Sequence, residues 1–294
     1  MNEKKLDFKI DYSKLDIISE YNTQNQRYPL VLSVPHSGRV FPQEFLDNIC
    51  VTEHELRSNE DPFVDELFID ASDRGIPMIS LNIGRAFIDV NRDAMEIDPS
   101  MFYNYPSNDL IVNNKRCRVG LGLLHRITSE RKNIYDGLLN YNEAQLRVKN
   151  VYNLYHKALQ KLIDRTVKKF GFCLVLDCHS MPSKICNIMQ DNRQIEFCLG
   201  TLFEQSCSSE IIEFMSHHLE QKYNISLDCP YSGAFISFNY CQPRKKISTL
   251  QIEINRSLYE DEAVYKKNAN FQYVSSDICD SVIALANFLL DFKK

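Results

Sequence analysis

The stretch LVLDCHSMPS, residues 174–183, decides the fold, because an apolar run of the kind that forms a buried strand ends in an acid, a thiol, a histidine and a serine. Directly before it, apolar residues recur at helical spacing from Leu146 to Phe170, and Gly171 can end that helix. A long helix that leads straight into a buried strand is typical of α/β proteins. His179 is therefore either a structural, hydrogen-bonded histidine or a side chain that the strand delivers into a site.

Helices and strands alternate along the rest of the chain, with no internal repeat and no Gly-rich or Pro-rich linker. Further strands are expected in PLVLSVPHSG, IPMISLNI and STLQIEINRSLY, at residues 29–38, 76–83 and 248–259. Further helices are expected at residues 61–75, Ser209–Lys222 and Ser276–Phe292. The irregular, polar segment Met95–Lys132 is long for a loop and is a candidate lid or site wall. We predict one domain over residues 1–294, an α/β sandwich with helices on both faces of a central sheet.

The bulk composition narrows the classes of partner. A hydrophobic content of 44% and a charged content of 25% over 294 residues describe an ordinary globular protein. The formal net charge of −5 gives no electrostatic reason to expect nucleic acid or an anionic membrane as a partner. No stretch reaches the length expected of a membrane span. A small-molecule partner is therefore expected, and a small anionic one would need local arginines; the chain is expected to be a monomer or a homodimer.

The ten cysteines do not form the pattern of a disulfide scaffold. No CxxC pair occurs, and several cysteines lie in or beside apolar runs. The N-terminal stretch MNEKKLDFKIDYSKL lacks the apolar centre of a signal peptide. We expect reduced thiols that act as small apolar side chains in a cytoplasmic protein.

Four polar clusters lie where predicted strands end or turn. They are PHSG with His36, NEDPFVDEL with Asp61, DCHSMP with His179, and QIEINR with Glu253. Strand ends are where ligands collect in open α/β sheets, so the two histidines can converge. Two imidazoles and a carboxylate are the donors of a catalytic zinc site with one open position, and a separate glutamate can then take a proton from water.

Each of these residues also has a structural interpretation. A histidine at a strand end often only makes structural hydrogen bonds, Asp61 before Pro62 suits a helix N-cap, and Glu253 can be an outward-facing ion-pair partner. The other histidines are weaker candidates: His54, His217 and His218 suit solvated positions, His156 suits packing or capping on the long helix, and His125 is ambiguous. From the residues alone, a metal-dependent hydrolase is one hypothesis among these.

The order of the motifs adds a family resemblance. PHSG, DPFVDELF, GRAFIDVNRD, DCHSMP, PYSG and LQIEINRSLY occur in the order typical of N-formylglutamate amidohydrolases, over about residues 29–262. The resemblance implies a three-layer α/β/α sandwich around a mixed sheet, similar to the zinc carboxypeptidases and aspartoacylases. It implies hydrolysis of the formyl amide of N-formyl-L-glutamate to formate and glutamate, with one Zn²⁺ ion, in histidine degradation.

The resemblance also implies roles at the metal. His36, Asp61 and His179 match the zinc ligands, although Glu60 is adjacent to Asp61 and can ligate instead. Glu253 matches the general base and acid, which takes a proton from the attacking water and then gives it to the departing amine.

Three further residues, Asn91, Arg92 and Arg256, match substrate-binding positions, and Arg85 matches a catalytic one. Asn91 and Arg92 match a clamp for the α-carboxylate, since a guanidinium binds a carboxylate through two parallel hydrogen bonds. Arg85 is expected to polarise the scissile carbonyl or to hold the second carboxylate, and Arg256 is another candidate for that contact. Asp177 is expected to orient a ligand imidazole rather than to bind the metal.

Three departures from the family pattern leave the substrate open. Ala234 follows Gly233 where a second glycine is expected, LGTLFEQSC at residues 199–207 lacks a GDR-like turn, and Ser248 stands where many relatives have histidine. None of them removes a proposed ligand or the base. The alternatives are hydrolysis of another N-acyl amino acid, a carboxypeptidase-like peptidase, or a non-catalytic binding protein with this fold.

Overall fold

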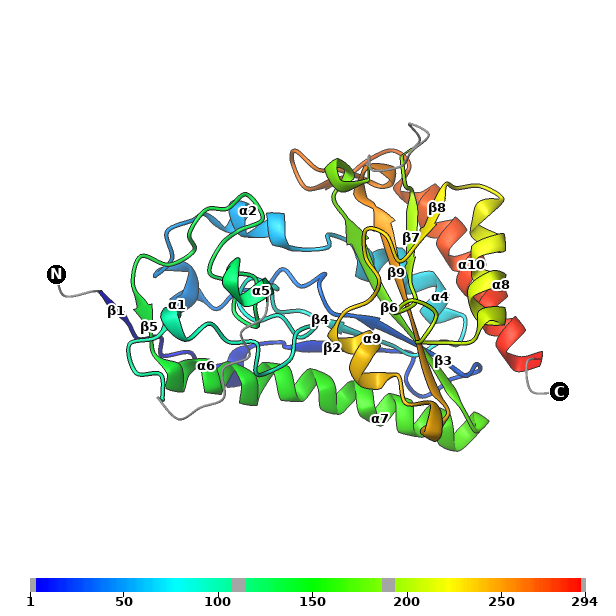
Figure 1. The fold of residues 1–294 in the computed structure, drawn as a ribbon, viewed down its shortest axis with the longest axis horizontal. Helices are drawn as coiled ribbons and strands as arrows, with labels where there is room; N and C mark the ends of the chain where they lie inside the picture. The colour runs from blue at the N-terminus through cyan, green and yellow to red at the C-terminus, as the bar shows by residue number, and fades with distance from the viewer. Residues whose placement is uncertain (1–3, 107–114, 187–193, 292–294) are drawn as a thin grey trace. The chain divides into compact units, whose positions relative to one another are not determined.

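The computed structural model describes residues 4–106, 115–186 and 194–291 (Figure 1). They fall into two compact units that are interleaved along the chain. The first unit comprises residues 1–19, 35–60 and 81–158, and the second comprises residues 20–34, 61–80 and 159–294. Each unit is therefore built from three stretches. The single domain expected from the sequence remains a prediction.

A seven-stranded sheet, almost wholly in the second unit, has the order β2-β4-β3-β6-β9-β7-β8. Its strands are β2 (Ile18–Tyr21), β3 (Leu30–Val34), β4 (Met78–Leu81), β6 (Cys173–Met181), β7 (Phe197–Gly200), β8 (Ile225–Leu227) and β9 (Ile247–Asn255). β4, β3, β6 and β9 pair in parallel, whereas β7 runs antiparallel to β9 and parallel to β8. The sheet is mixed, as predicted.

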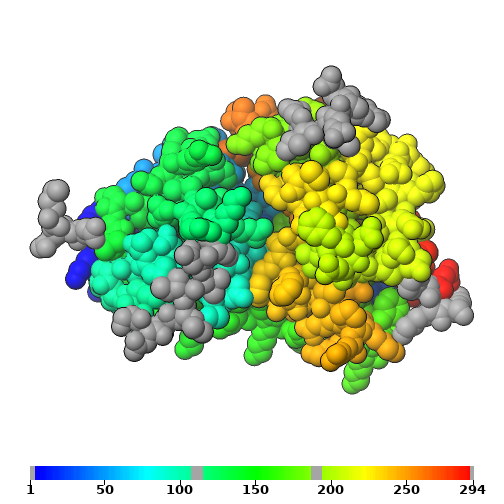
Figure 2. Space-filling view, in the orientation of Figure 1, coloured from blue at the N-terminus to red at the C-terminus, as the bar shows by residue number. Residues whose placement is uncertain are grey.

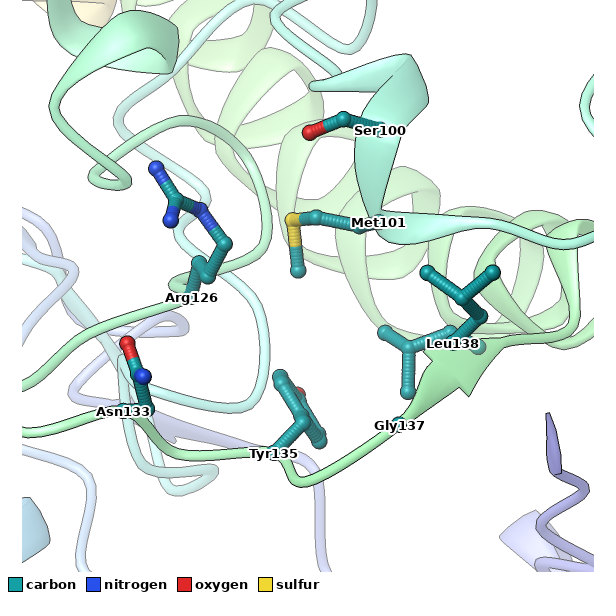
Figure 3. A pocket seen from close by; sticks show the side chains of 8 residues that line it. Ser100, Met101, Arg126, Asn133, Tyr135, Gly137 and Leu138 are labelled. Carbon is teal, nitrogen blue, oxygen red and sulfur yellow. The ribbon is translucent and has the colours of Figure 1, made fainter. Parts of the chain in front are cut away.

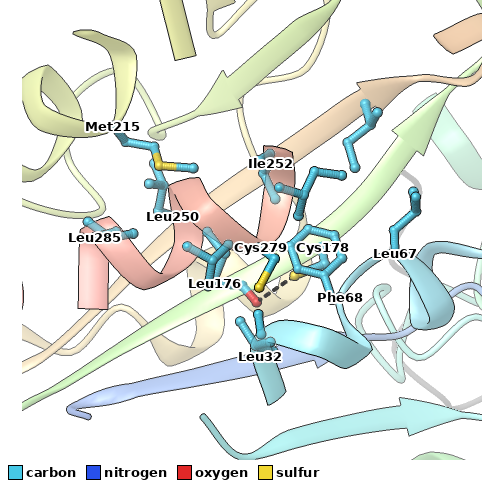
Figure 4. Close-up of a cluster of buried hydrophobic side chains, with 14 of the residues drawn as sticks. Leu32, Leu67, Phe68, Leu176, Cys178, Met215, Leu250, Ile252, Cys279 and Leu285 are labelled. Carbon is cyan, nitrogen blue, oxygen red and sulfur yellow. Dashed lines mark hydrogen bonds between the residues drawn. The ribbon is translucent and has the colours of Figure 1, made fainter. Parts of the chain in front are cut away.

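Helices of the second unit cover one face of this sheet with an apolar core. They are α3 (Val64–Leu67), α4 (Ile69–Asp73), α8 (Ser209–Glu220) and α10 (Phe271–Asp291). Side chains alternate along a strand, so the even-numbered residues of β6 and β9, such as Leu176 and Ile252, share this face. They pack with Phe68, Met215 and Leu285 from the helices, all fully buried (Figure 4).

The odd-numbered residues of β6 and β9 point to the other face, where α9 (Phe235–Tyr240) packs on both strands. Thr249 Oγ1 donates a hydrogen bond of 2.9 Å to the backbone oxygen of Ser237 on this helix. α9 belongs to the gold-coloured part of the surface in Figure 2. Its Phe238 is 74% exposed. Helices therefore cover both faces of the sheet, which confirms the predicted three-layer α/β/α arrangement.

Several predicted boundaries differ from the structure. The helix expected over residues 61–75 is two short helices, α3 and α4, because the chain leaves helical geometry at Phe68 (φ −101°, ψ −1°). β6 continues for two residues beyond His179, so this histidine lies inside the strand rather than at its end. The final helix starts at Phe271 rather than Ser276, and its expected end at Phe292 lies outside the described residues.

The expected long helix is α6 (Tyr141–Arg147) and α7 (Asn153–Phe170), joined by a π-helical segment over Val148–Tyr152. Gly171 ends α7 with a positive φ of 80°, a conformation that glycine adopts without strain. The remaining elements are short: β1 (Lys5–Leu6), α1 (Gln43–Leu46), α2 (Glu53–Leu56), α5 (Lys115–Arg118), β5 (Leu138–Leu139), β10 (Glu260–Asp261) and β11 (Lys266–Lys267). The candidate lid, residues 95–132, thus contains α5, and residues 107–114 of it are not described.

By length and composition, α10 is long and apolar enough to cross a membrane, contrary to the expectation that no stretch reaches that length. Half of its most apolar window is buried inside the structure, and its inward residues belong to the core of the second unit. Buried helices in the core of a protein can be equally long and apolar, and the inward residues of α10 make it such a core helix.

The first unit contains a fully buried cation, Arg147, at the end of α6. Its guanidinium donates to both carboxylate oxygens of Glu143, at 2.8 and 2.9 Å, and to the backbone oxygen of Phe87 at 2.9 Å. The ring of Phe87 lies 4.0 Å from the guanidinium carbon, and the hydroxyl of Tyr135 lies 3.2 Å from Nη1. Nη2 lies 2.8 Å from Glu143 Oε2 as an ion-pair contact. Removing one partner of this buried pair leaves the other charge without compensation.

Arg147→Ala is expected to lower the free energy of unfolding by about 3–5 kcal/mol, because Glu143 would remain buried without its counter-charge. Urea unfolding followed by circular dichroism measures this change. Lys149→Ala is the matched control: it removes one positive charge two residues away at an exposed position, and it is expected to change stability by less than about 0.5 kcal/mol. Equal losses in the two variants would contradict the structural role of Arg147.

Candidate active site

The adjacent parallel strands β6 and β9 carry the chemistry of the second unit on their α9-facing side. Their register sets Asp177 beside Gln251 and His179 beside Glu253. Neighbouring strands are about 4.8 Å apart, so paired residues present their side chains next to one another. All four side chains are buried, Glu253 being 6% exposed. The outward-facing ion pair considered for Glu253 is therefore wrong, because β9 has a strand on each side and helices on both faces.

The imidazole of His179 has a carboxylate at each ring nitrogen. Asp177 Oδ2 lies 3.0 Å from Nε2, and Asp61 Oδ2 lies 2.9 Å from Nδ1. Burial alone would lower the pKa of His179, but these two acids raise it well above its usual value. A neutral imidazole carries only one N–H, so it can satisfy one carboxylate, and the second contact needs a further proton or another cation. Together with His36, Asp61 and His179 form a set of donors that could hold a metal ion.

Asp61 is held from its other side by Arg256. Arg256 Nη2 donates to Asp61 Oδ1 at 2.9 Å, and its Nε donates to the hydroxyl of Ser180 at 3.2 Å. Arg256 is 5% exposed and Asp61 is 2% exposed. The structure thus gives Arg256 a positioning contact with the acid beside His179. Asp61 does not form the N-cap hydrogen bond considered from the sequence, because α3 begins at Val64 without a side-chain cap.

In the first unit, the remaining sequence candidates gather around one buried acid, Asp89. Its Oδ1 lies 2.8 Å from His36 Nε2, and its Oδ2 accepts from Arg85 Nε at 2.8 Å and lies 3.7 Å from Arg92 Nε. The backbone N–H of Asn91 donates to Oδ1 at 2.8 Å. Burial alone would raise the pKa of Asp89, but the surrounding cations, Arg85 first among them, hold it well below its usual value. An ionised Asp89 only accepts hydrogen bonds, so the ring nitrogen of His36 that donates to it is Nε2.

His125, the ambiguous histidine of the sequence, belongs to the same network. Its Nε2 lies 3.4 Å from Asp89 Oδ2, and its Nδ1 accepts from the side-chain amide of Asn59 at 2.6 Å. Burial lowers the pKa of His125 to about 4, outweighing the attraction of Asp89, so the ring is neutral near pH 7. Glu60, the alternative metal ligand, is also a buried residue of the first unit.

Sequence reasoning missed two residues of these networks, Asp89 and Gln251. Both lie two positions before a residue that was singled out, Asn91 and Glu253 respectively. In a strand this spacing places two side chains on one face, which is how Asp177 was related to His179. The same spacing would have found Gln251. Sequence spacing could not identify Asp89, because its contacts with His36 and His125 join residues that are 53 and 36 positions apart along the chain.

A separate cavity of about 130 Å³ lies in the first unit (Figure 3). Arg126, Met101 and Tyr135 line it together with the chain around Leu138. None of the candidate catalytic or ligating residues lines this cavity. It is therefore not the site described above.

The low pKa of His125 predicts a pH dependence of stability. The unfolded chain binds a proton at this residue near pH 6.5, whereas the folded chain does so only near pH 4. The contribution is present above pH 6.5 and is lost as the pH falls towards 4, by up to about 3 kcal/mol. In urea unfolding, His125→Gln should therefore lose less stability than the wild type between pH 7 and pH 4.5. The exposed His54→Gln is the control, and a wild-type-like pH dependence in His125→Gln would refute the assignment.

The sequence of this chain is similar to those of known proteins. N-formylglutamate deformylases of Pseudomonas putida and Pseudomonas aeruginosa are 27% and 25% identical to it. The alignments cover 80% and 90% of this chain, and 83% and 92% of those proteins.

Solved structures are also similar to this chain. The crystal structure of N-formylglutamate amidohydrolase from Ralstonia eutropha JMP134 superposes with a TM-score of 0.87 at 27% identity, covering 94% of this chain and 99% of that one. A gene product from Agrobacterium tumefaciens, 14% identical with a TM-score of 0.64, covers 95% of this chain and 98% of its own and shows a likeness of fold alone. The profile of the N-formylglutamate amidohydrolase family matches residues 28–260. This chain belongs to the N-formylglutamate amidohydrolase family.

Proposed function

We propose that this protein is a metal-dependent amidohydrolase that converts N-formyl-L-glutamate and water to formate and L-glutamate. Family membership and the names of the relatives support the substrate. The observation that carries the reaction type is the pairing of His179, which has acids at both ring nitrogens, with Glu253 on the next strand. The family resemblance implies a place in histidine breakdown. The ten free thiols support the further proposal of a cytoplasmic protein, and a monomer or homodimer remains the proposed state.

The proposed cofactor is one Zn²⁺ ion held by His36, Asp61 and His179, a set of donors that can hold a metal ion. Each imidazole has an aspartate at Nε2, Asp89 for His36 and Asp177 for His179. Such carboxylate–histidine pairs direct the Nδ1 lone pair towards a metal. His36 follows the end of β3 by two residues, so it stays within about 7 Å of that strand, which neighbours β6. The residues present therefore fit the metal.

When bound, the ion would supply a Lewis acid that polarises the formyl carbonyl and acidifies water. Glu253 is proposed to take a proton from the water while the water oxygen bonds to the formyl carbon. It then gives this proton to the nitrogen as the carbon–nitrogen bond breaks, so that formate and the free amine leave. A buried carboxylate suits this task, because both proton transfers need a fixed acceptor close to the reacting atoms.

Arginines are proposed to bind the two carboxylates of the substrate. Arg92 remains a cation near pH 7, since burial lowers its pKa only to about 10. Its Nη1 donates to the backbone oxygen of Asn91 at 2.9 Å, which fixes the pair proposed to clamp the α-carboxylate. The Arg85 side chain is more exposed, at 18% against 9% for Arg92, and suits the carbonyl oxygen or the second carboxylate. Arg256 is ion-paired with Asp61, so we propose that it positions Asp61 in addition to supplying a positive charge near the substrate.

The central test is a formate-release assay on N-formyl-L-glutamate with and without a chelator. Formate is expected to be released by the purified protein, to stop after treatment with a chelator, and to return when Zn²⁺ is added. N-acetyl-L-glutamate, N-formyl-L-methionine and a short peptide serve as parallel substrates. Faster turnover of any of these compounds would identify it, rather than N-formyl-L-glutamate, as the preferred substrate. Full activity in metal-free protein would show that the reaction does not depend on a metal.

Glu253→Gln tests the proposed base. The variant keeps the shape of the side chain but cannot accept a proton, so kcat is expected to fall by about 10²–10⁴-fold while the metal content stays at the wild-type level. Metal analysis and steady-state kinetics measure the two quantities. A near-normal kcat would exclude Glu253, whereas loss of the metal together with activity would make it a ligand instead.

A further inference from the structure

Gln251 is the neighbour of Glu253 on the same face of β9. Its Nε2 donates a hydrogen bond of 2.8 Å to Glu253 Oε1, within the buried α9-facing side of the sheet. Gln251 itself is 2% exposed. Because a carboxylate only accepts hydrogen bonds, the amide must turn its nitrogen towards Glu253 and its oxygen away from it.

The other end of this amide is not satisfied. Gln251 Oε1 is buried and has no hydrogen-bond partner among the residues that the structure describes. A buried, unpaired amide oxygen destabilises a fold, and leucine or methionine of similar volume would avoid the penalty. Packing therefore does not explain a glutamine here, whereas the hydrogen bond to Glu253 does.

The surroundings keep the amide in this position. Gln251 pairs with Asp177 on β6 and with Gly200 on β7. A Cβ atom at Gly200 would lie 3.1 Å from Gln251 Cβ and 2.9 Å from the backbone nitrogen of Gly233. The chain at residues 232–233 thus closes over the strand where a side chain on β7 would otherwise stand, and it limits where the Gln251 side chain can move.

We propose that Gln251 is a positioning residue for the general base: its Nε2–H holds one oxygen of Glu253 and thereby aims the other at the reacting proton. This inference rests on the proposed function and adds to it a residue that acts through Glu253. A fixed carboxylate matters in catalysis because small errors in the placement of a base cost large factors in rate.

Gln251→Leu tests the proposal, because it keeps the volume and removes both the donor and the unpaired acceptor. We expect kcat for formate release to fall by about 10- to 100-fold, while KM stays within about twofold and the metal content is unchanged. The melting temperature combines two opposing changes, the loss of the unpaired Gln251 oxygen and the loss of the donor to buried Glu253, so kcat is the deciding measurement. A purely structural role predicts a kcat that is largely preserved in the folded variant.

Two further variants complete the experiment. Gln251→Glu keeps the shape but replaces the donor by a second carboxylate, and its loss of kcat should be at least as large. Thr249→Val, two residues earlier on the same face, removes a buried hydroxyl that donates to the backbone oxygen of Ser237, and it should leave kcat unchanged. A folded Gln251→Leu enzyme with wild-type kcat would overturn the inference. A wild-type enzyme that releases no formate would instead overturn the proposed function.

Discussion

The constraint on which the rest of this structure depends is the parallel register of β6 and β9. One face of this strand pair is the apolar core beneath α3, α4, α8 and α10. Because side chains alternate, the same register places Asp177 beside Gln251 and His179 beside Glu253 on the opposite face. A slip by one residue would turn these polar side chains into the apolar core and Leu176 out of it. The burial that stabilises the second unit therefore also sets the spacing of an imidazole and a carboxylate.

The electrostatics of the buried histidines follow from their acid partners. His179 has two carboxylates and a pKa above its usual value, whereas His125 lies at the edge of the Asp89 network and has a pKa of about 4. His36 has Asp89 at Nε2. An imidazole with a carboxylate at Nε2 and a lone pair at Nδ1 is prepared for a cation, and a neutral ring that accepts from an amide, as His125 does from Asn59, is not. The partners, rather than the histidines themselves, distinguish the proposed ligands from the structural histidine.

The sequence predicted the fold well where periodicity decides it. Alternation in residues 250–255 and the apolar run before His179 gave the two central strands, and Gly171 marked the end of α7 correctly. Periodicity could not show the break at Phe68, because the apolar positions continue across it. It also could not show that both faces of β9 are buried. Motif order brought the candidate residues into consideration, but the contacts of Asp89 and Arg256 depend on tertiary structure that local sequence does not encode.

The departures from the family pattern are not scattered in space. Leu202, Phe203 and Glu204 form a left-handed turn with φ values of 52°, 57° and 64°, a conformation that costs a non-glycine residue about 1–2 kcal/mol. Leu202 N donates to the backbone oxygen of Ser232, and its side chain packs against Gly233, the residue before Ala234. Two of the three departures therefore belong to one contact, and it borders Gly200, the β7 partner of Gln251. Because this turn and the 232–234 segment hold each other in place, a change in one constrains the other. The strained turn therefore follows Gly200 at the end of β7, the strand that pairs with β9 and its Glu253, and the contact with the 232–234 segment holds it there.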